Sequence, residues 1–216
     1  MLRCDASLPL FGGAHRGLQA LEPNRLLLDY GFCSLPYDSY HVTAFDVANL
    51  KDLERCHAEV RDEMRMAFDV LPGLEGFRAT FLSEAVLSEL ASAEWDLSFG
   101  YGGLCIWGGV MVLLLAPLDE AAYGRFFEAR TRLCRTYLEG FGVGGSEMYM
   151  PHLSLGYFLN HEASSSAAEK VPEWDTVLRS AVGDATVSFP RVSLYGFTDM
   201  ATFFREAASV PPGLMR

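Results

Sequence analysis

The chain is poor in basic residues. It has 17 Lys and Arg against 28 Asp and Glu, which gives its 216 residues a formal net charge of -11. Proteins bind long nucleic acids largely by neutralising phosphates with Lys and Arg, so this deficit argues against a long duplex as a partner. A small anion is still compatible with the charge, because the local field inside a cleft governs its binding.

A long apolar segment is also absent. The longest apolar run covers residues 104–117, contains Gly108-Gly109, and is too short to span a bilayer as a helix. No charged N-terminal segment followed by a secretory apolar core is visible. The five cysteines are scattered and include no Cys-x-x-Cys pair, a pattern typical of a reduced compartment. We therefore expect a cytoplasmic protein without a membrane partner.

The usual motifs of metal and nucleotide-loop chemistry are missing as well. The sequence contains no His-Glu-x-x-His motif and no dense Asp/His cluster. Its glycine run, Gly100-Tyr101-Gly102-Gly103, lacks the lysine and the spacing of a P-loop. We therefore expect no metal and no cofactor.

The chain does have the material for a sizeable core. Half of its residues are hydrophobic and 12% are aromatic, and neither a long linker nor a tandem repeat interrupts it. A chain of this length and composition can bury its apolar side chains as one domain or as two small lobes with a shared interface. We expect a single domain over residues 1–216.

Hydrophobic periodicity predicts a mixture of strands and helices. The expected strands cover residues 25–30, 40–46, 76–82, 95–99, 105–115, 151–157, 185–189 and 191–197. The expected helices cover residues 50–71, 84–90, 119–140 and 171–182. Asp119 is the expected N-cap of the third helix, and Gly140 is its expected end. Residues 160–169 read as an exposed loop.

Two apolar segments, residues 40–45 and 151–157, repeat one short pattern. Each places a hydroxyl residue two positions after a histidine, and the four residues concerned are His41, Thr43, His152 and Ser154. Because side chains alternate between the faces of a strand, the histidine and the hydroxyl of each segment emerge together, while Val42 and Leu153 point into the core. Two such strands side by side would present two imidazoles and two neutral donors, a set that suits a phosphate.

Cleavage of a phosphodiester needs a base, an acid and stabilisation of charge on the phosphate oxygens. Two histidines can divide the first two tasks, since their reference pKa lies near operating pH. The hydroxyls of Thr43 and Ser154 would donate hydrogen bonds to the non-bridging oxygens. The opposing interpretation is two half-buried strands with structurally bonded histidines. A further histidine, His57, lies beside a helical stripe and reads as a surface or core residue.

These residues resemble the two-histidine (2H) phosphoesterase superfamily, whose signature is a pair of His-x-Thr/Ser motifs bordered by hydrophobic residues on strands. The segment Leu35-Pro36-Tyr37-Asp38-Ser39-Tyr40 also resembles an uncharacterised bacterial-type branch of that superfamily. The resemblance implies a bilobal α+β fold with two mainly antiparallel sheets flanking a central cleft and helices on the outside. It also implies one catalytic domain of two pseudo-symmetric lobes, with His41 and His152 catalytic and Thr43 and Ser154 on the phosphate.

The function implied by the resemblance is that of a metal-independent phosphodiesterase. Its substrate would be a small nucleotide, short oligonucleotide or RNA end, such as a 2′,3′-cyclic phosphate or a 2′-linked phosphodiester. Three aromatic residues near the motifs are candidates for base stacking, namely Tyr40, Tyr149 and Tyr157. The alternatives are a non-catalytic nucleotide-binding or sensor protein that uses the same cleft, and a structural interaction protein in which the two triplets are coincidental.

Overall fold

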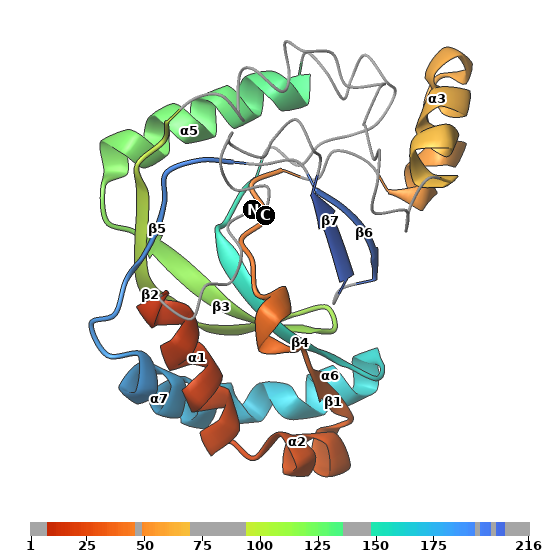
Figure 1. Ribbon diagram of the computed structural model, residues 1–216. Coiled ribbons are helices and arrows are strands. Elements are labelled where there is room, and N and C mark those ends of the chain that lie inside the picture. The colour runs from red at the N-terminus through yellow and green to blue at the C-terminus, as the bar shows by residue number, and fades with distance from the viewer. Residues whose placement is uncertain are drawn as a thin grey trace, which may run out of the picture.

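A curled, antiparallel five-stranded sheet forms the centre of the computed structural model (Figure 1). The structure describes residues 8–45, 49–69, 94–135, 148–192, 195–199 and 202–205. The strand order is β1-β4-β3-β2-β5, and a separate two-stranded sheet pairs β6 with β7. The strands are β1 (Phe32–Ser34), β2 (Leu97–Trp107), β3 (Val110–Pro117), β4 (His152–Phe158), β5 (Val187–Phe189), β6 (Tyr195–Asp199) and β7 (Thr202–Arg205). This mixture of helices and antiparallel strands agrees with the expected α+β class.

Some of the helices lie together on one side of the five-stranded sheet. The helices are α1 (Pro9–Ala20), α2 (Pro23–Tyr30), α3 (Ala58–Asp69), α5 (Glu120–Leu133), α6 (His161–Ala167) and α7 (Val171–Val182). Figure 1 shows α1, α2, α6 and α7 together on one side of the sheet, with β6 and β7 on the other side. Among the described residues, no helix combines the length and the apolar character needed to cross a membrane.

The main core lies between these helices and the sheet. Leu113 of β3 and Leu153 of β4 are fully buried there, as is Leu178 of α7. Helices α1 and α7 approach closely, because a Cβ atom added at Gly13 would lie 2.8 Å from the Cα atom of Val182. One face of the sheet is thus covered by α1, α2, α6 and α7, and α5 lies on the opposite side, where it supplies Phe126, Ala129 and Leu133 to the core.

The apolar run that we expected to be one strand over residues 105–115 is a hairpin instead. Trp107 of β2 pairs with Val110 of β3 across a two-residue turn. Gly108 in this turn has a φ of 60°, a left-handed conformation that favours glycine. The prediction of a single strand was wrong because the two glycines reverse the chain within the apolar run, so its two halves are neighbours in the sheet.

Several other predicted elements are confirmed. The side chain of Asp119 accepts hydrogen bonds from the N–H groups of Ala121 and Ala122 and so caps α5. Residues 171–182 form α7, residues 97–99 of the predicted 95–99 strand belong to β2, and β5 occupies residues 187–189. The predicted strand over 191–197 begins later, at Tyr195 of β6. The predictions for residues 76–82 and 84–90, and for the end of the third helix at Gly140, lie outside the described residues.

Three predictions of local structure were wrong. Residues 25–30 belong to helix α2, which starts at Pro23 and ends at Tyr30. The next residue, Gly31, has a left-handed backbone conformation that terminates the helix. Residues 161–167 form helix α6, which the side chain of Asn160 caps through the N–H of Ala163. The helix expected over 50–71 is divided into a 3₁₀ helix, Leu50–Glu54, and α3. The N-terminal helix α1 has no counterpart among the predictions.

Candidate active site

The two His-x-hydroxyl segments lie side by side. Val42 forms an antiparallel β-bridge with Leu153, and these are the middle residues of the two triplets. The second triplet lies in β4 as expected. The first was expected in a strand over residues 40–46, but within residues 40–45 it forms only this single bridge. A 3₁₀ helix, Tyr37–Ser39, lies between β1 and this triplet, so β1 and Val42 pair with β4 as two separate segments.

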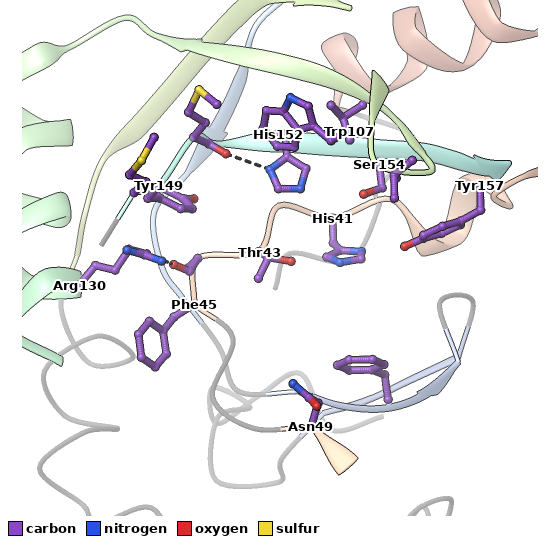
Figure 2. Close-up of a pocket in the computed structure, with 16 residues that line it drawn as sticks. His41, Thr43, Phe45, Asn49, Trp107, Arg130, Tyr149, His152, Ser154 and Tyr157 are labelled. Atoms are coloured by element: carbon purple, nitrogen blue, oxygen red, sulfur yellow. Dashed lines mark hydrogen bonds between the residues drawn. The ribbon is translucent and has the colours of Figure 1, made fainter. Parts of the chain in front are cut away.

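The antiparallel register brings the four side chains together. Because the two chains run in opposite directions, His41 lies beside Ser154, and Thr43 lies beside His152. All four side chains line one cavity of about 540 Å³ on the sheet face opposite the main core (Figure 2). Each histidine is therefore next to the hydroxyl of the other triplet, and the two imidazoles are diagonal neighbours.

The two imidazole rings are held in the same way. The Nδ1 atom of His41 lies 2.7 Å from the carbonyl oxygen of Ser39, and the Nδ1 atom of His152 lies 2.9 Å from that of Met150. In both cases the carbonyl is two residues upstream, and Figure 2 draws the second contact as a dashed line. Because a carbonyl oxygen only accepts, each Nδ1 carries a proton. Nε2 is then the nitrogen that gains or loses a proton in each ring.

Side-chain hydrogen bonds brace the two segments that carry these carbonyl groups. Ser39 is almost fully buried, and its hydroxyl donates to the carbonyl of Pro36 at 2.7 Å, which braces the 3₁₀ turn. On the other segment, the hydroxyl of Tyr123 donates to the carbonyl of Tyr149 at 3.2 Å. Burial raises the pKa of the Tyr123 phenol, and the positive charge of Arg130 opposes part of that rise. Supporting contacts of this kind hold functional rings in a single orientation.

Trp107 is a cavity residue that sequence reasoning missed. It ends β2 beside the Gly108-Gly109 turn, and its ring lies 4.9 Å from the ring of His152 at an angle of 69°. Together with the carbonyl of Met150, this edge-to-face contact restrains the His152 ring. No local pattern in the sequence distinguishes Trp107 from the other apolar residues of its strand.

Arg130 is the second residue that sequence reasoning missed. It lies on α5, is only 6% exposed, and lines the cavity. Its Nε donates to the carbonyl of Ala44 at 3.2 Å, and its guanidinium carbon lies 4.6 Å from the ring centre of Tyr149 and 5.8 Å from that of Phe45. A signal for it existed, because position 130 falls on the apolar face of α5, where a charge is the exception.

Two of the three candidate stacking residues line the cavity. Tyr149 and Tyr157 are both part of its wall. Tyr40 is not, and we correct that expectation, because its side chain is fully buried in the main core. There its ring packs against those of Phe11 and Tyr37. Alternation along the chain explains the difference, since Tyr40 immediately precedes His41 and so points to the opposite side.

An irregularity in β4 brings Tyr157 to the cavity. Strict alternation would place Tyr157 on the same face as Leu153 and Leu155, which are fully buried. The pairing with β3 shifts by one residue between Met111 and Val112, and Leu155 is left without a partner in that register. A shift of this kind exchanges the faces for the residues that follow it. Tyr157 therefore joins His152 and Ser154 at the cavity.

The electrostatic character of the cavity differs from that of the whole chain. Its lining includes Arg130, His41 and His152, and it contains no Asp or Glu among the residues that the structure describes. The chain as a whole has a net charge of -11. A cavity with a fixed cation and no carboxylate in its described wall favours an anionic ligand even in an acidic protein. No described group of three or more His, Cys, Asp or Glu side chains is placed to hold a metal ion.

No protein-family model matches this chain, and no curated protein sequence matches it at a significant level. The resemblance to the 2H phosphoesterases therefore depends on the two short motifs. The geometry of their four side chains is an independent observation, because neither motif on its own specifies that the two segments pair.

Proposed function

We propose that this chain is a metal-independent phosphoric diester hydrolase of the 2H phosphoesterase type. Its substrate is a small nucleotide or RNA end, such as a 2′,3′-cyclic phosphate or another 2′-linked phosphodiester. The observation that supports this most strongly is the Val42–Leu153 bridge, which gathers two imidazoles and two hydroxyls around one cavity. One phosphate can contact all four groups only if the two segments are adjacent.

The two histidines divide the proton transfers of hydrolysis. Nε2 of the neutral histidine removes a proton from water, whose oxygen attacks phosphorus. The bond between phosphorus and one ribose oxygen breaks, and Nε2 of the protonated histidine gives its proton to that oxygen. The product is a phosphate monoester and a ribose hydroxyl, with one water consumed. The reverse reaction exchanges the two roles, so His41 and His152 serve as acid and base in either order.

The hydroxyls stabilise the charge that develops on the phosphate, and the cation makes the cavity favourable to anions. Thr43 and Ser154 donate to the non-bridging oxygens without adding a group that titrates in the working pH range. Arg130 contributes a fixed positive charge to the same cavity. Donors that are already oriented in a partly enclosed site stabilise a transition state without reorganisation.

The size of the cavity matches a small substrate. Its volume of about 540 Å³ falls within the range of roughly 300–1,000 Å³ that is typical of small-molecule sites. Tyr149, Tyr157 and Trp107 supply aromatic surface to its wall, which suits a nucleobase. The acidity of the chain disfavours a long duplex.

The proposal includes the finer fold of the superfamily, in which two lobes of one catalytic domain over residues 1–216 flank the cleft. The five-stranded sheet with α1, α2, α6 and α7 outside it would form one lobe. The sheet of β6 and β7 would belong to the other, and it contributes Phe197 to the cavity wall. A cytoplasmic location is part of the same proposal.

The test is a panel of 2′,3′-cyclic mononucleotides and 2′-5′-linked dinucleotides, incubated with the protein in the presence of EDTA. Phosphorus NMR identifies the monoester formed, and calorimetry measures binding. We expect turnover of at least one compound, and its loss in both His41→Ala and His152→Ala. Binding without turnover would favour the non-catalytic sensor. The absence of both binding and turnover would overturn the proposal.

A further inference from the structure

The guanidinium of Arg130 is fixed in the cavity wall by contacts from two separate segments. Its Nε is hydrogen-bonded to the carbonyl of Ala44. The ring of Tyr149 lies against it at 4.6 Å, and the ring of Phe45 lies at 5.8 Å. A buried arginine with its position set by a hydrogen bond and two rings loses little conformational freedom when it binds an anion.

This cation lies at one end of the histidine pair. Ala44 directly follows Thr43, and Tyr149 is three residues before His152, so Arg130 adjoins the Thr43 and His152 side of the site. Figure 2 shows Arg130, Tyr149 and Phe45 together beyond Thr43, with Tyr157 at the other side of the four motif residues. The cavity therefore has a cationic end at Arg130 and an opposite end at Tyr157, with the proposed catalytic groups between them.

We propose that Arg130 forms a second anion subsite, and that the substrate carries a second phosphate in addition to the scissile one. This inference rests on the proposed function. A 2′,3′-cyclic nucleotide with a 5′-phosphate has the matching layout. Its cyclic phosphate lies on the C2′–C3′ edge of the ribose, its base on C1′ at one end of that edge, and its 5′-phosphate beyond C4′ at the other.

The chemistry of the cavity agrees with a phosphate at this position. Guanidinium groups present planar, forked donors that match phosphate oxygens, and such charge-assisted bonds are stronger than neutral ones. No carboxylate of the described cavity lining would repel the second phosphate. With the 5′-phosphate on Arg130, the base would lie toward Tyr157.

The experiment compares adenosine 2′,3′-cyclic phosphate with its 5′-phosphorylated form as substrates of the full chain. We expect the wild type to prefer the 5′-phosphorylated compound. In Arg130→Met the ratio of the two kcat/KM values should fall by roughly 10-fold to 100-fold. The ratio for Arg130→Lys should lie between those of the wild type and Arg130→Met, because lysine keeps the charge but loses the forked donor geometry of the guanidinium. The ratio is insensitive to partial misfolding, since both substrates report on the same folded molecules.

Arg125→Met is the matched control, because Arg125 lies on the same helix, is exposed, and is not part of the cavity lining. Its ratio should equal that of the wild type. Calorimetry with adenosine 2′,5′-bisphosphate and adenosine 2′-monophosphate measures the same preference without turnover. If the wild type turns over both substrates equally, or Arg130→Met keeps the wild-type ratio, the second subsite is wrong while the proposed function stands. If neither these cyclic compounds nor any compound of the panel described above is cleaved, the proposed function fails, and the binding ratio alone decides whether the subsite exists.

Discussion

Val42 and Leu153 lie opposite each other in an antiparallel bridge at the centres of the two His-x-hydroxyl triplets. An antiparallel pair has a local twofold axis, and here that axis relates His41 to His152. The same axis relates the carbonyl of Ser39 to that of Met150, the two groups that hold the imidazoles. The local symmetry of the site thus includes its supporting contacts.

Replacing either histidine should nearly abolish turnover. We expect His41→Ala and His152→Ala each to lower kcat on the best substrate by roughly 100-fold to 10,000-fold, because each loses a proton-transfer group. Circular dichroism should report an unchanged fold. His57→Ala is the control, since His57 is exposed and does not line the cavity, and it should keep wild-type turnover. Wild-type turnover in either of the first two variants would exclude the paired-histidine mechanism.

Removing either hydroxyl should have a smaller effect. Thr43→Ala and Ser154→Ala should each lower kcat by roughly fivefold, because a neutral hydrogen bond contributes about 1 kcal/mol and water can replace a lost donor. Thr43→Ser and Ser154→Thr keep the hydroxyl and should retain most of the activity. Equal losses in the alanine variants and in these conservative variants would mean that the hydroxyls do not act as donors.

Gly156 should tolerate no side chain. A Cβ atom there would overlap the ring of Phe32 and the carbonyl of Cys33 where β4 pairs with β1. We expect Gly156→Ala to lower the free energy of unfolding by about 1–3 kcal/mol, the usual cost of overpacking. Gly124→Ala is the matched control, since open space surrounds Gly124 within α5, and it should raise stability by about 0.5–1 kcal/mol. Urea denaturation measures both, and an unchanged midpoint for Gly156→Ala would contradict the packing of β1 on β4.

Tyr101 should make stability depend on pH in the alkaline range. Its phenol donates to Oδ1 of Asp175 at 2.8 Å. Burial, followed by this hydrogen bond and the negative charge of Asp175, raises the pKa of Tyr101 above its ordinary value of 10.0, against a smaller opposing effect of Arg179. Below about pH 10 the Tyr101 phenol is protonated in both the folded and the unfolded protein, so its contribution to the free energy of unfolding is fully present. That contribution is lost as the pH rises from about 10 through the higher pKa of the folded state.

We therefore expect the free energy of unfolding of the wild type to fall from about pH 10 upward. The Tyr101→Phe variant should be less stable at neutral pH and should depend less steeply on pH above 10. Chemical denaturation at a series of pH values measures this. Parallel profiles for the two proteins would show that Tyr101 does not contribute to the alkaline loss of stability.

Local signals in the sequence were sufficient where one strong determinant acts. Asp119 caps α5 as expected, and the apolar period over residues 171–182 produced the expected α7. They were insufficient for α2 and α6, whose 8 and 7 residues span too few turns for a period to be recognised. They also failed at Gly108-Gly109, where one apolar run serves two neighbouring strands.

The sequence by itself determined the chemistry of the candidate site. His41 and Thr43 share one face of an extended segment, as His152 and Ser154 do, because the alternation of side chains is a local property of the backbone. Only the tertiary structure decided that Val42 meets Leu153 and that a register shift carries Tyr157 to the cavity. It also decided that Trp107 and Arg130 join the wall, because both approach it through elements distant in sequence. Such long-range contacts depend on how the sheet and α5 pack, and no local pattern of residues encodes that packing.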